Sequence, residues 1–367
     1  MIEYSTTSNS TGKQNSYETS LSTKKEENIV NITGLKKYFG IVKAVNNIDL
    51  KIKKGSIFGF LGPNGAGKTT TINCLLTLLK PTAGEGTIAG FDIYDISHIR
   101  SKVAGVFQEQ TLDEQLSGYQ NLDLHARLYH LPKITRKARI VELVESVGLS
   151  DRIHDSVIKY SGGMRRRLEI ARGLLTEPEI LFLDEPTIGL DPQSRSHIWD
   201  KIKEMNKRNN LTVFITTHHM DEAEALCDHI AIIDKGQIVI QGSPEELKGS
   251  LAHDIIAVQI KEPEKVNDAV QRINSIPEVE SIKTIDDTIH IGTRNGPELV
   301  ATIAQVLGSS EECNKIAIHT IEIKKPSLND VFMYYTGKNF RDSDEISLSE
   351  RLTIHGRKQR SRVGFRR

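Results

Sequence analysis

The sequence has few cysteines, no excess of charge and no long apolar run. Its three cysteines, Cys74, Cys227 and Cys313, are far apart and form no C-x-x-C pair. They therefore indicate reduced thiols in a cytosolic protein rather than a disulfide framework or a metal site. No apolar run approaches the roughly 18 residues that a membrane-spanning helix needs, and no apolar segment near the N-terminus resembles a signal peptide. We expect a chain that does not span a membrane by itself.

The overall charge and the length of the chain exclude few classes of protein. The 48 basic and 48 acidic residues balance, so the overall charge favours no particular partner. A chain of 367 residues can bury a large core, and we expect two cores. Residues 1–28 lack apolar periodicity, since 13 of the first 23 are Ser, Thr or Asn. We expect them to form a disordered polar tail.

What the sequence does contain is a glycine-rich turn between a short apolar run at 57–61 and a helical pattern at 72–79. The turn fits G-x-x-x-x-G-K-[ST], a match that arises by chance in about one chain in a hundred of this length. Glycines let backbone N–H groups converge on phosphate oxygens, and the helix N-terminus adds positive partial charge. Lys68 is expected to neutralise the β- and γ-phosphates, and the Thr69 hydroxyl to bind Mg²⁺. The residues expected to bind nucleotide are Gly62, Pro63, Asn64, Gly65, Ala66, Gly67, Lys68, Thr69 and Thr70.

An aromatic residue precedes Gly40, after a predicted strand that begins near Ile29. Aromatic faces stack well on an adenine ring, so Phe39 is the candidate for this contact and Tyr38 the alternative. An aromatic ring that packs against a strand end explains the same residues equally well.

Further along the chain, a predicted strand ends at Gln108, which by itself reads as a loop residue. The helical spacing from Asn121 to Ser161 predicts a helical insert at about 110–160. Ser161, Gly162 and Gly163 then open a helix whose free N–H groups can face an anion, although taken alone an ordinary N-cap is preferred.

Two adjacent acids, Asp184 and Glu185, end a buried-strand pattern at 180–183. Because consecutive strand residues point in different directions, we expect one to hold the water shell of a metal and the other to polarise a water molecule. Asp191 reads as an N-cap before a proline. His218 ends another buried strand, where it either senses a γ-phosphate or bonds the backbone.

The order of these motifs resembles the nucleotide-binding subunit of ATP-binding cassette (ABC) transporters over roughly 29–245. GPNGAGKTT looks like Walker A, Gln108 the Q-loop, YSGGM the signature, ILFLDEP Walker B, GLD at 189–191 the D-loop, and His218 the switch histidine. The finer resemblance is to drug-export ATPases of the daunorubicin-resistance type, through YSGGMRRRLEIA and PSLNDVFMYYTG. Met164, in place of glutamine, and His219, in place of tyrosine, depart from the usual patterns.

The resemblance implies ATP and Mg²⁺ as cofactors and a role for each residue. Glu185, His218 and Gln108 would be catalytic. Thr69, Gln108 and Asp184 would hold the metal. Two copies would face head to tail, so that Ser161, Gly162, Gly163 and Asp191 complete the partner's phosphate site. A separate membrane permease is expected, with peripheral attachment at the cytoplasmic face of the cell membrane and no nucleic acid partner.

The expected fold is α/β, an ABC-type P-loop NTPase domain at 29–250 with a helical insert. A pattern of β-α-β-β-α-β follows, which predicts a small ferredoxin-like α+β accessory domain at 251–340. The segment 341–367 is expected to be a basic tail, because 351–367 holds seven Arg or Lys and no acid. A solvated tail is favoured there, and contact with anionic lipid or nucleic acid is the alternative.

The predicted function is an ATPase subunit of an exporter of drug-like or amphipathic molecules. The same ATPase with another cargo, such as a lipid, polysaccharide or ion, is the first alternative. A soluble ATP-dependent switch in translation or DNA repair is the second, and the single cassette with its short insert argues against it.

Overall fold

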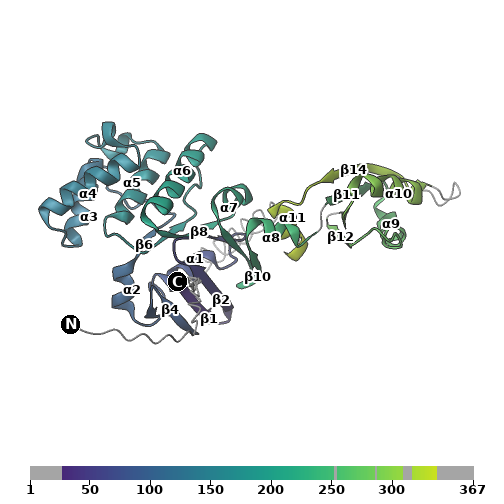
Figure 1. The fold of residues 1–367 in the computed structure, drawn as a ribbon, viewed down its shortest axis with the longest axis horizontal. Helices are drawn as coiled ribbons and strands as arrows, with labels where there is room; N and C mark the ends of the chain where they lie inside the picture. Colours follow the sequence, from purple (N-terminus) through teal and green to yellow (C-terminus); the bar gives the residue numbers. More distant parts are fainter. Residues whose placement is uncertain (1–26, 252–253, 286, 309–315, 337–367) are drawn as a thin grey trace, which may run out of the picture.

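The computed structural model describes residues 27–251, 254–285, 287–308 and 316–336 (Figure 1). The expectations for the N-terminal tail up to residue 26, for the basic tail and for Cys313 lie outside the described residues. Cys74 and Cys227 are buried free thiols. Within the described ranges, the structure contains no helix of the length and apolarity that crossing a membrane requires.

A six-stranded sheet in the order β10-β9-β3-β8-β7-β6 forms the centre of the fold. The strands are β3 (Ile57–Leu61), β6 (Val103–Val106), β7 (Ile180–Asp184), β8 (Thr212–Thr217), β9 (His229–Asp234) and β10 (Gln237–Gly242). All neighbours are parallel except β10, which pairs antiparallel with β9 at the edge. Every residue of β3, β7 and β8 is buried, as expected for parallel strands that are covered on both faces.

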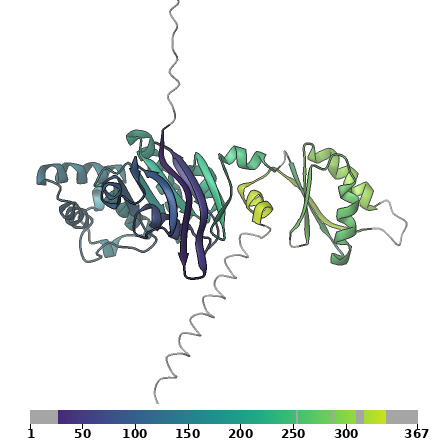
Figure 2. The ribbon, with the colours of Figure 1, turned by 90° about the horizontal axis from the view of Figure 1, so that it is seen from below.

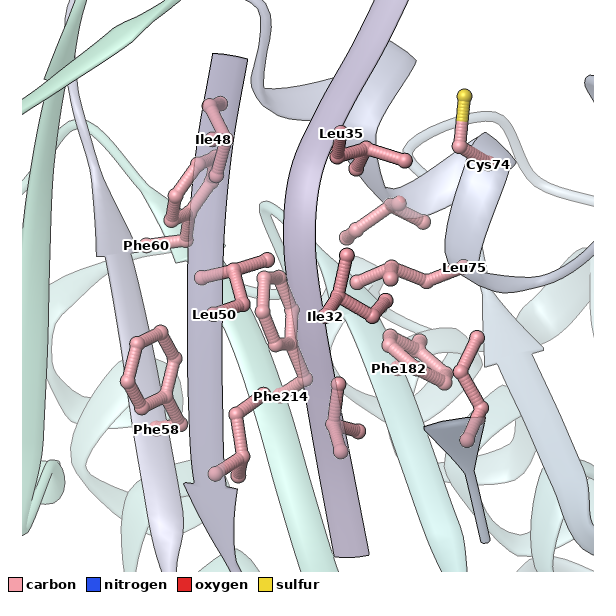
Figure 3. Close-up of a cluster of buried hydrophobic side chains, with 14 of the residues drawn as sticks. Ile32, Leu35, Ile48, Leu50, Phe58, Phe60, Cys74, Leu75, Phe182 and Phe214 are labelled. Carbon is pink, nitrogen blue, oxygen red and sulfur yellow. The ribbon is translucent and has the colours of Figure 1, made fainter. Parts of the chain in front are cut away.

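An antiparallel sheet in the order β2-β1-β4-β5 covers one face of the central sheet (Figure 3). Its strands are β1 (Asn28–Phe39), β2 (Val42–Lys53), β4 (Ala83–Ile88) and β5 (Phe91–Asp92), and helices α1 (Lys68–Leu75) and α2 (Ile96–Lys102) complete this layer. The ring of Phe214 lies 5.6 Å from those of Phe58 and Phe60 and 5.4 Å from that of Phe182. These rings come from three adjacent strands of the central sheet, β3, β8 and β7, and they pack in the core that this sheet shares with the antiparallel sheet.

Helices cover the opposite face and form a second core. They are α5 (Gly162–Leu174), α6 (Pro192–Asn209), α7 (Met220–Leu226) and α8 (Pro244–Gly249). The helical insert lies to one side and contains α3 (Gly118–Leu128), α4 (Lys133–Ser146) and the 3₁₀ turns Ser150–Arg152 and Val157–Lys159 (Figure 1). Helix α5 belongs to both parts, because Ile170 packs in the second core and Leu168 in the core of the insert. The predicted α/β fold with a helical insert is confirmed.

The C-terminal unit is an antiparallel sheet in the order β12-β13-β11-β14 with its own core. Its elements are β11 (Asp254–Ile260), the 3₁₀ turn Pro263–Lys265, α9 (Val266–Asn274), β12 (Ser281–Ile285), β13 (Thr288–Thr293), α10 (Gly296–Gly308) and β14 (Ile318–Lys324). This is the β-α-β-β-α-β order that the sequence predicted, and the strand order is that of a ferredoxin-like unit.

The last described helix, α11 (Leu328–Thr336), returns to the central part of the molecule (Figure 2). Its Val331 and Phe332 are buried in the second core, together with Leu226 of α7. Within the range 251–340, expected as an accessory domain, the described part therefore ends in a helix whose buried side chains pack beneath the central sheet.

Candidate nucleotide-binding site

The glycine-rich loop between β3 and α1 can only be built with glycines at two positions. A Cβ at Gly62 would lie 2.4 Å from the Ile233 carbonyl oxygen, and one at Gly67 would lie 2.4 Å from that of Ala44. Gly67 also has a φ of 112°, in the region that L side chains rarely adopt. The loop is thus pressed against neighbouring backbone, with its N–H groups at the start of a helix, as phosphate binding requires.

Lys68 lies beneath this loop and is 5% exposed. Its ammonium donates to the carbonyl oxygens of Gly62 at 2.7 Å and Pro63 at 3.2 Å, and it lies 3.1 Å from Glu185 Oε1. The next residue, Thr69, donates from its hydroxyl to Asp184 Oδ2 at 3.0 Å. Both side chains predicted to contact phosphate and metal therefore meet the carboxyl end of β7.

Asp184 and Glu185 point in different directions, as the sequence predicted. Asp184 accepts from Thr69 and also from the Thr216 hydroxyl, at 2.5 Å. Glu185 has a φ of 47°, and its amide donates to the carbonyl and hydroxyl oxygens of Thr216, each at 3.1 Å. Left-handed backbone costs energy at a residue other than glycine, and Glu185 is one of nine such residues in the described part of the chain.

The pKa of the Glu185 carboxyl is about 2, below the usual 4.5. Burial is the largest influence and raises the pKa, but His218 and the positive charge of Lys68 together outweigh it. His218 Nδ1 lies 3.2 Å from Glu185 Oε2, although its direction is unfavourable for a hydrogen bond. Because the folded-state pKa is depressed, this carboxylate stabilises the fold above about pH 4.5, and that stabilisation is lost as the pH falls toward about 2.

The other predicted motifs meet at a cavity of about 270 Å³ beside Glu185. Gln108, which follows β6, lines it together with Gly162 and with Gly189 of the GLD segment. His219, which departs from the usual tyrosine, packs against His218 with ring centroids 4.2 Å apart and the ring planes tilted by 40°. Burial lowers the pKa of His219.

Three further predicted site residues, Phe39, Ser161 and Asp191, are not part of the contacts around Lys68 and Glu185. Phe39 is 48% exposed at the end of β1, whereas the Tyr38 hydroxyl donates to Asn46 Oδ1 at 2.8 Å, so Phe39 has the more available ring. Ser161 caps α5 by accepting from the Met164 amide at 3.3 Å.

Asp191 caps α6 by accepting from the amide of Ser194 at 2.9 Å. In a single copy, the hydrogen bonds described for Ser161 and Asp191 do not reach Lys68 or the two acids.

Sequence reasoning missed two contributors to this site. Thr216 bonds both acids, and a polar residue at the end of the apolar strand LTVFITT was a signal that could have found it. Arg166 donates to backbone around Glu185 and is 7% exposed. Its helical spacing from Gly163 and Ile170 is shared by Arg167, so the sequence held no signal that singled out Arg166.

Lys68 is buried under the glycine loop and pairs with Glu185, Thr69 bonds Asp184, and His218 lies beside Glu185. This arrangement defines a P-loop nucleotide-binding site. Comparisons with known proteins also indicate an ATP-binding protein. Residues 45–188 match the family model for the ABC transporter, and residues 242–336 match the C-terminal domain of ATP-binding proteins like DrrA1-3.

Curated relatives are similar over most of the chain. The daunorubicin resistance ATP-binding protein DrrA3 of Streptomyces coeruleorubidus is 36% identical over 85% of this chain and 97% of its own length. The Nod factor export ATP-binding protein I of Ralstonia nicotianae is 35% identical over 86% of this chain and 95% of its own length. The ATP-binding cassette MJ0796 was solved as a dimer in a post-hydrolysis state with ADP and phosphate. It is 28% identical over 58% of this chain and 98% of its own, with a TM-score of 0.52.

This chain belongs to the ATP-binding subunits of ABC transporters, ATPases that power transport by hydrolysing ATP, and it carries a C-terminal domain of the DrrA type.

The pKa of Glu185 supplies a first prediction. Lys68→Met should raise it, because burial would then be opposed by His218 alone. The measurement is a carbon-13 NMR titration of the side-chain carboxyl, assigned with Glu185→Gln. Lys54→Met is the matched control, because Lys54 pairs with the distant Glu179 at 3.2 Å. If Lys68→Met left the titration unchanged, Lys68 would not be what holds this carboxylate ionised.

Proposed function

We propose that this chain is the ATP-hydrolysing subunit of an exporter of drug-like or amphipathic compounds, attached to a membrane permease at the cytoplasmic face of the cell membrane. The observation that carries the proposal is the joining of two features in one chain: the Lys68–Glu185–His218 cluster and the DrrA-type C-terminal domain. The relative named for Nod factor export supports a second candidate, the same ATPase with a different cargo. The proposed division places the ATPase domain at 29–250 and the accessory domain at 251–340.

The described residues fit ATP and a magnesium ion. Phe39 would stack on adenine, and the loop from Gly62 to Thr70 would hold the phosphates. The Thr69 hydroxyl and the Asp184 carboxylate, 3.0 Å apart, supply oxygen atoms of the kind that magnesium prefers as ligands, and Gln108 lines the cavity beside Glu185. Bound Mg²⁺ would supply charge neutralisation between the β- and γ-phosphates.

Glu185 is proposed as the general base. The positive charge of Lys68, 3.1 Å from Glu185 Oε1, helps to keep the pKa of Glu185 at about 2, which makes the carboxylate a weak base. When Lys68 engages a phosphate, its attraction for Glu185 weakens and the pKa of Glu185 rises. The carboxylate is then better suited to accept a proton from the attacking water, while His218 Nδ1 lies 3.2 Å from its other oxygen.

Ser161, Gly162, Gly163 and Asp191 are proposed to complete the site of a second copy. In one copy the Ser161 hydroxyl only caps its own helix, and both Ser161 and Gly162 are exposed at the start of α5. The ATP-binding cassette MJ0796, which this chain resembles and which was solved as a dimer, supports a pair of copies. Closure of such a pair would depend on ATP, because each phosphate site then uses both copies.

The role of Glu185 predicts a separation of binding from chemistry. Glu185→Gln should keep ATP affinity, while hydrolysis falls by roughly two orders of magnitude or more, the scale of a positioned base. It should also accumulate an ATP-bound dimer that size exclusion detects. Calorimetry and phosphate release measure the two effects. Hydrolysis at the parent's rate would move the catalytic role elsewhere, with His218 the first residue to test.

The shared site predicts complementation between two inactive variants. Ser161→Arg should bind ATP but fail to dimerise, because a bulky cation would occupy the phosphate space, and Lys68→Ala should lose tight ATP binding. A head-to-tail dimer of the two contains one site with both defects and one with neither. The mixture should therefore regain partial ATPase activity that neither variant has alone. Normal dimerisation and hydrolysis by Ser161→Arg would leave Ser161 as a helix cap only.

The cargo is tested by transport. Inside-out membrane vesicles from cells that express this chain from its native locus should accumulate a fluorescent anthracycline when ATP is added. Vesicles carrying Glu185→Gln should not, although they contain the same amount of subunit. If both vesicle types behave alike while the purified chain hydrolyses ATP, the ATPase assignment stands and the cargo belongs to another class, such as a lipid or polysaccharide.

A further inference from the structure

We propose that Arg166 is a positioning residue that clamps the backbone on both sides of Glu185, the proposed general base. This inference rests on the role proposed for Glu185. Arg166 lies on α5, one turn after the Ser161 cap, and its side chain passes through the protein interior to the end of β7.

The hydrogen bonds of the guanidinium show what it holds. Its Nε donates to the carbonyl oxygen of Pro186 at 2.8 Å, and Nη2 donates to that of Asp184 at 3.0 Å. These are the carbonyl groups of the residues immediately before and after Glu185. A planar guanidinium can serve both at once because its donors form a rigid fork, which a lysine ammonium lacks.

This clamp lies where the backbone needs support. Glu185 adopts a φ of 47°, a conformation that the chain does not favour by itself. Thr216 holds the Glu185 amide, and Arg166 holds the two adjacent carbonyls. Glu185 is therefore fixed from β8 and from α5, and loss of either support would let its carboxylate move relative to Lys68 and His218.

The same guanidinium reaches the segment around Gln108. Its Nη1 donates to the Phe107 carbonyl at 2.5 Å and to Glu169 Oε2 at 3.0 Å. Glu169 Oε1 in turn accepts from the Thr111 amide at 3.0 Å. Arg166 and Glu169 are 7% and 1% exposed, so the pair is buried with its charges matched. The clamp thus ties the position of Glu185 to the segment 107–111 on the side of the helical insert.

A purely structural role for Arg166 makes a different prediction from a positioning role. If Arg166 only holds α5 to the sheet, its loss should lower thermal stability and ATP affinity together with hydrolysis. If Arg166 positions Glu185, its loss should lower kcat while ATP binding, which depends on Lys68 and the glycine loop, is retained.

The experiment compares Arg166→Gln with Arg167→Gln. Arg167 is the matched control because it lies on the same helix and donates only to Val147 and Gly148 of the insert, at 3.0 and 3.2 Å. We expect Arg166→Gln to lower kcat by roughly 10- to 100-fold, the scale of a misplaced catalytic group, with ATP affinity within about twofold of the parent. Arg167→Gln should change kcat by less than about twofold.

Hydrogen exchange gives a readout that does not depend on catalysis. The Glu185 amide donates to Thr216 of β8, and the amides of Ile188 and Leu190 donate to carbonyl oxygens within the turn after β7. In nucleotide-free protein, Arg166→Gln should speed exchange in a peptide that covers 184–190, and Arg167→Gln should not. Unchanged exchange together with a parental kcat would overturn the proposal.

A double-mutant cycle separates this proposal from the role of Glu185. In a Glu185→Gln background, Arg166→Gln should cause no further loss of hydrolysis, because it acts through the missing carboxylate. Additive losses would overturn the positioning role. If Glu185→Gln hydrolyses ATP normally, the general-base assignment fails first. If Arg166→Gln does not fold, Arg166→Lys replaces it: the lysine keeps the charge beside Glu169 but not the fork, so the kcat defect should persist, and a parental kcat would contradict the clamp.

Discussion

The buried contact between Lys68 and Glu185 is the interaction around which the central part of this protein is arranged. Two opposite charges are removed from water here, and such a pair is stable only with good geometry and further hydrogen bonds. The carbonyls of Gly62 and Pro63 satisfy Lys68, while Thr216 and His218 support Glu185. In the proposed function, phosphate would replace Glu185 as the partner of Lys68, so nucleotide binding would act directly on this contact.

The order of strands explains how these residues meet. Lys68 follows β3 and Glu185 follows β7, and in the central sheet β8 lies between them. The end of β8 carries Thr216, and His218 follows directly after the strand; both contact Glu185. Because the strands are parallel, all three carboxyl ends share one edge, and residues far apart in the chain form a single site.

Much of the fold could be predicted because its signals are local. The apolar runs of β3, β7 and β8 read as buried strands, and the β-α-β-β-α-β pattern appears as the C-terminal sheet. The packing of α11 could not be predicted in this way. Its apolar face fits any core equally well, and only the folded chain shows that Phe332 is buried beneath the central sheet rather than in the ferredoxin-like core.

The sequence by itself determined the kind of chemistry, because a glycine loop, a lysine, adjacent acids and a histidine in this order carry their spacing with them. It could not determine which of the consecutive arginines Arg165, Arg166 and Arg167 turns inward. Three adjacent residues on a helix point about 100° apart, so the choice depends on which face meets the sheet. Tertiary structure decided that Arg166 meets the backbone around Glu185, because a buried guanidinium must be satisfied and the carbonyl groups of Asp184 and Pro186 lie within its reach.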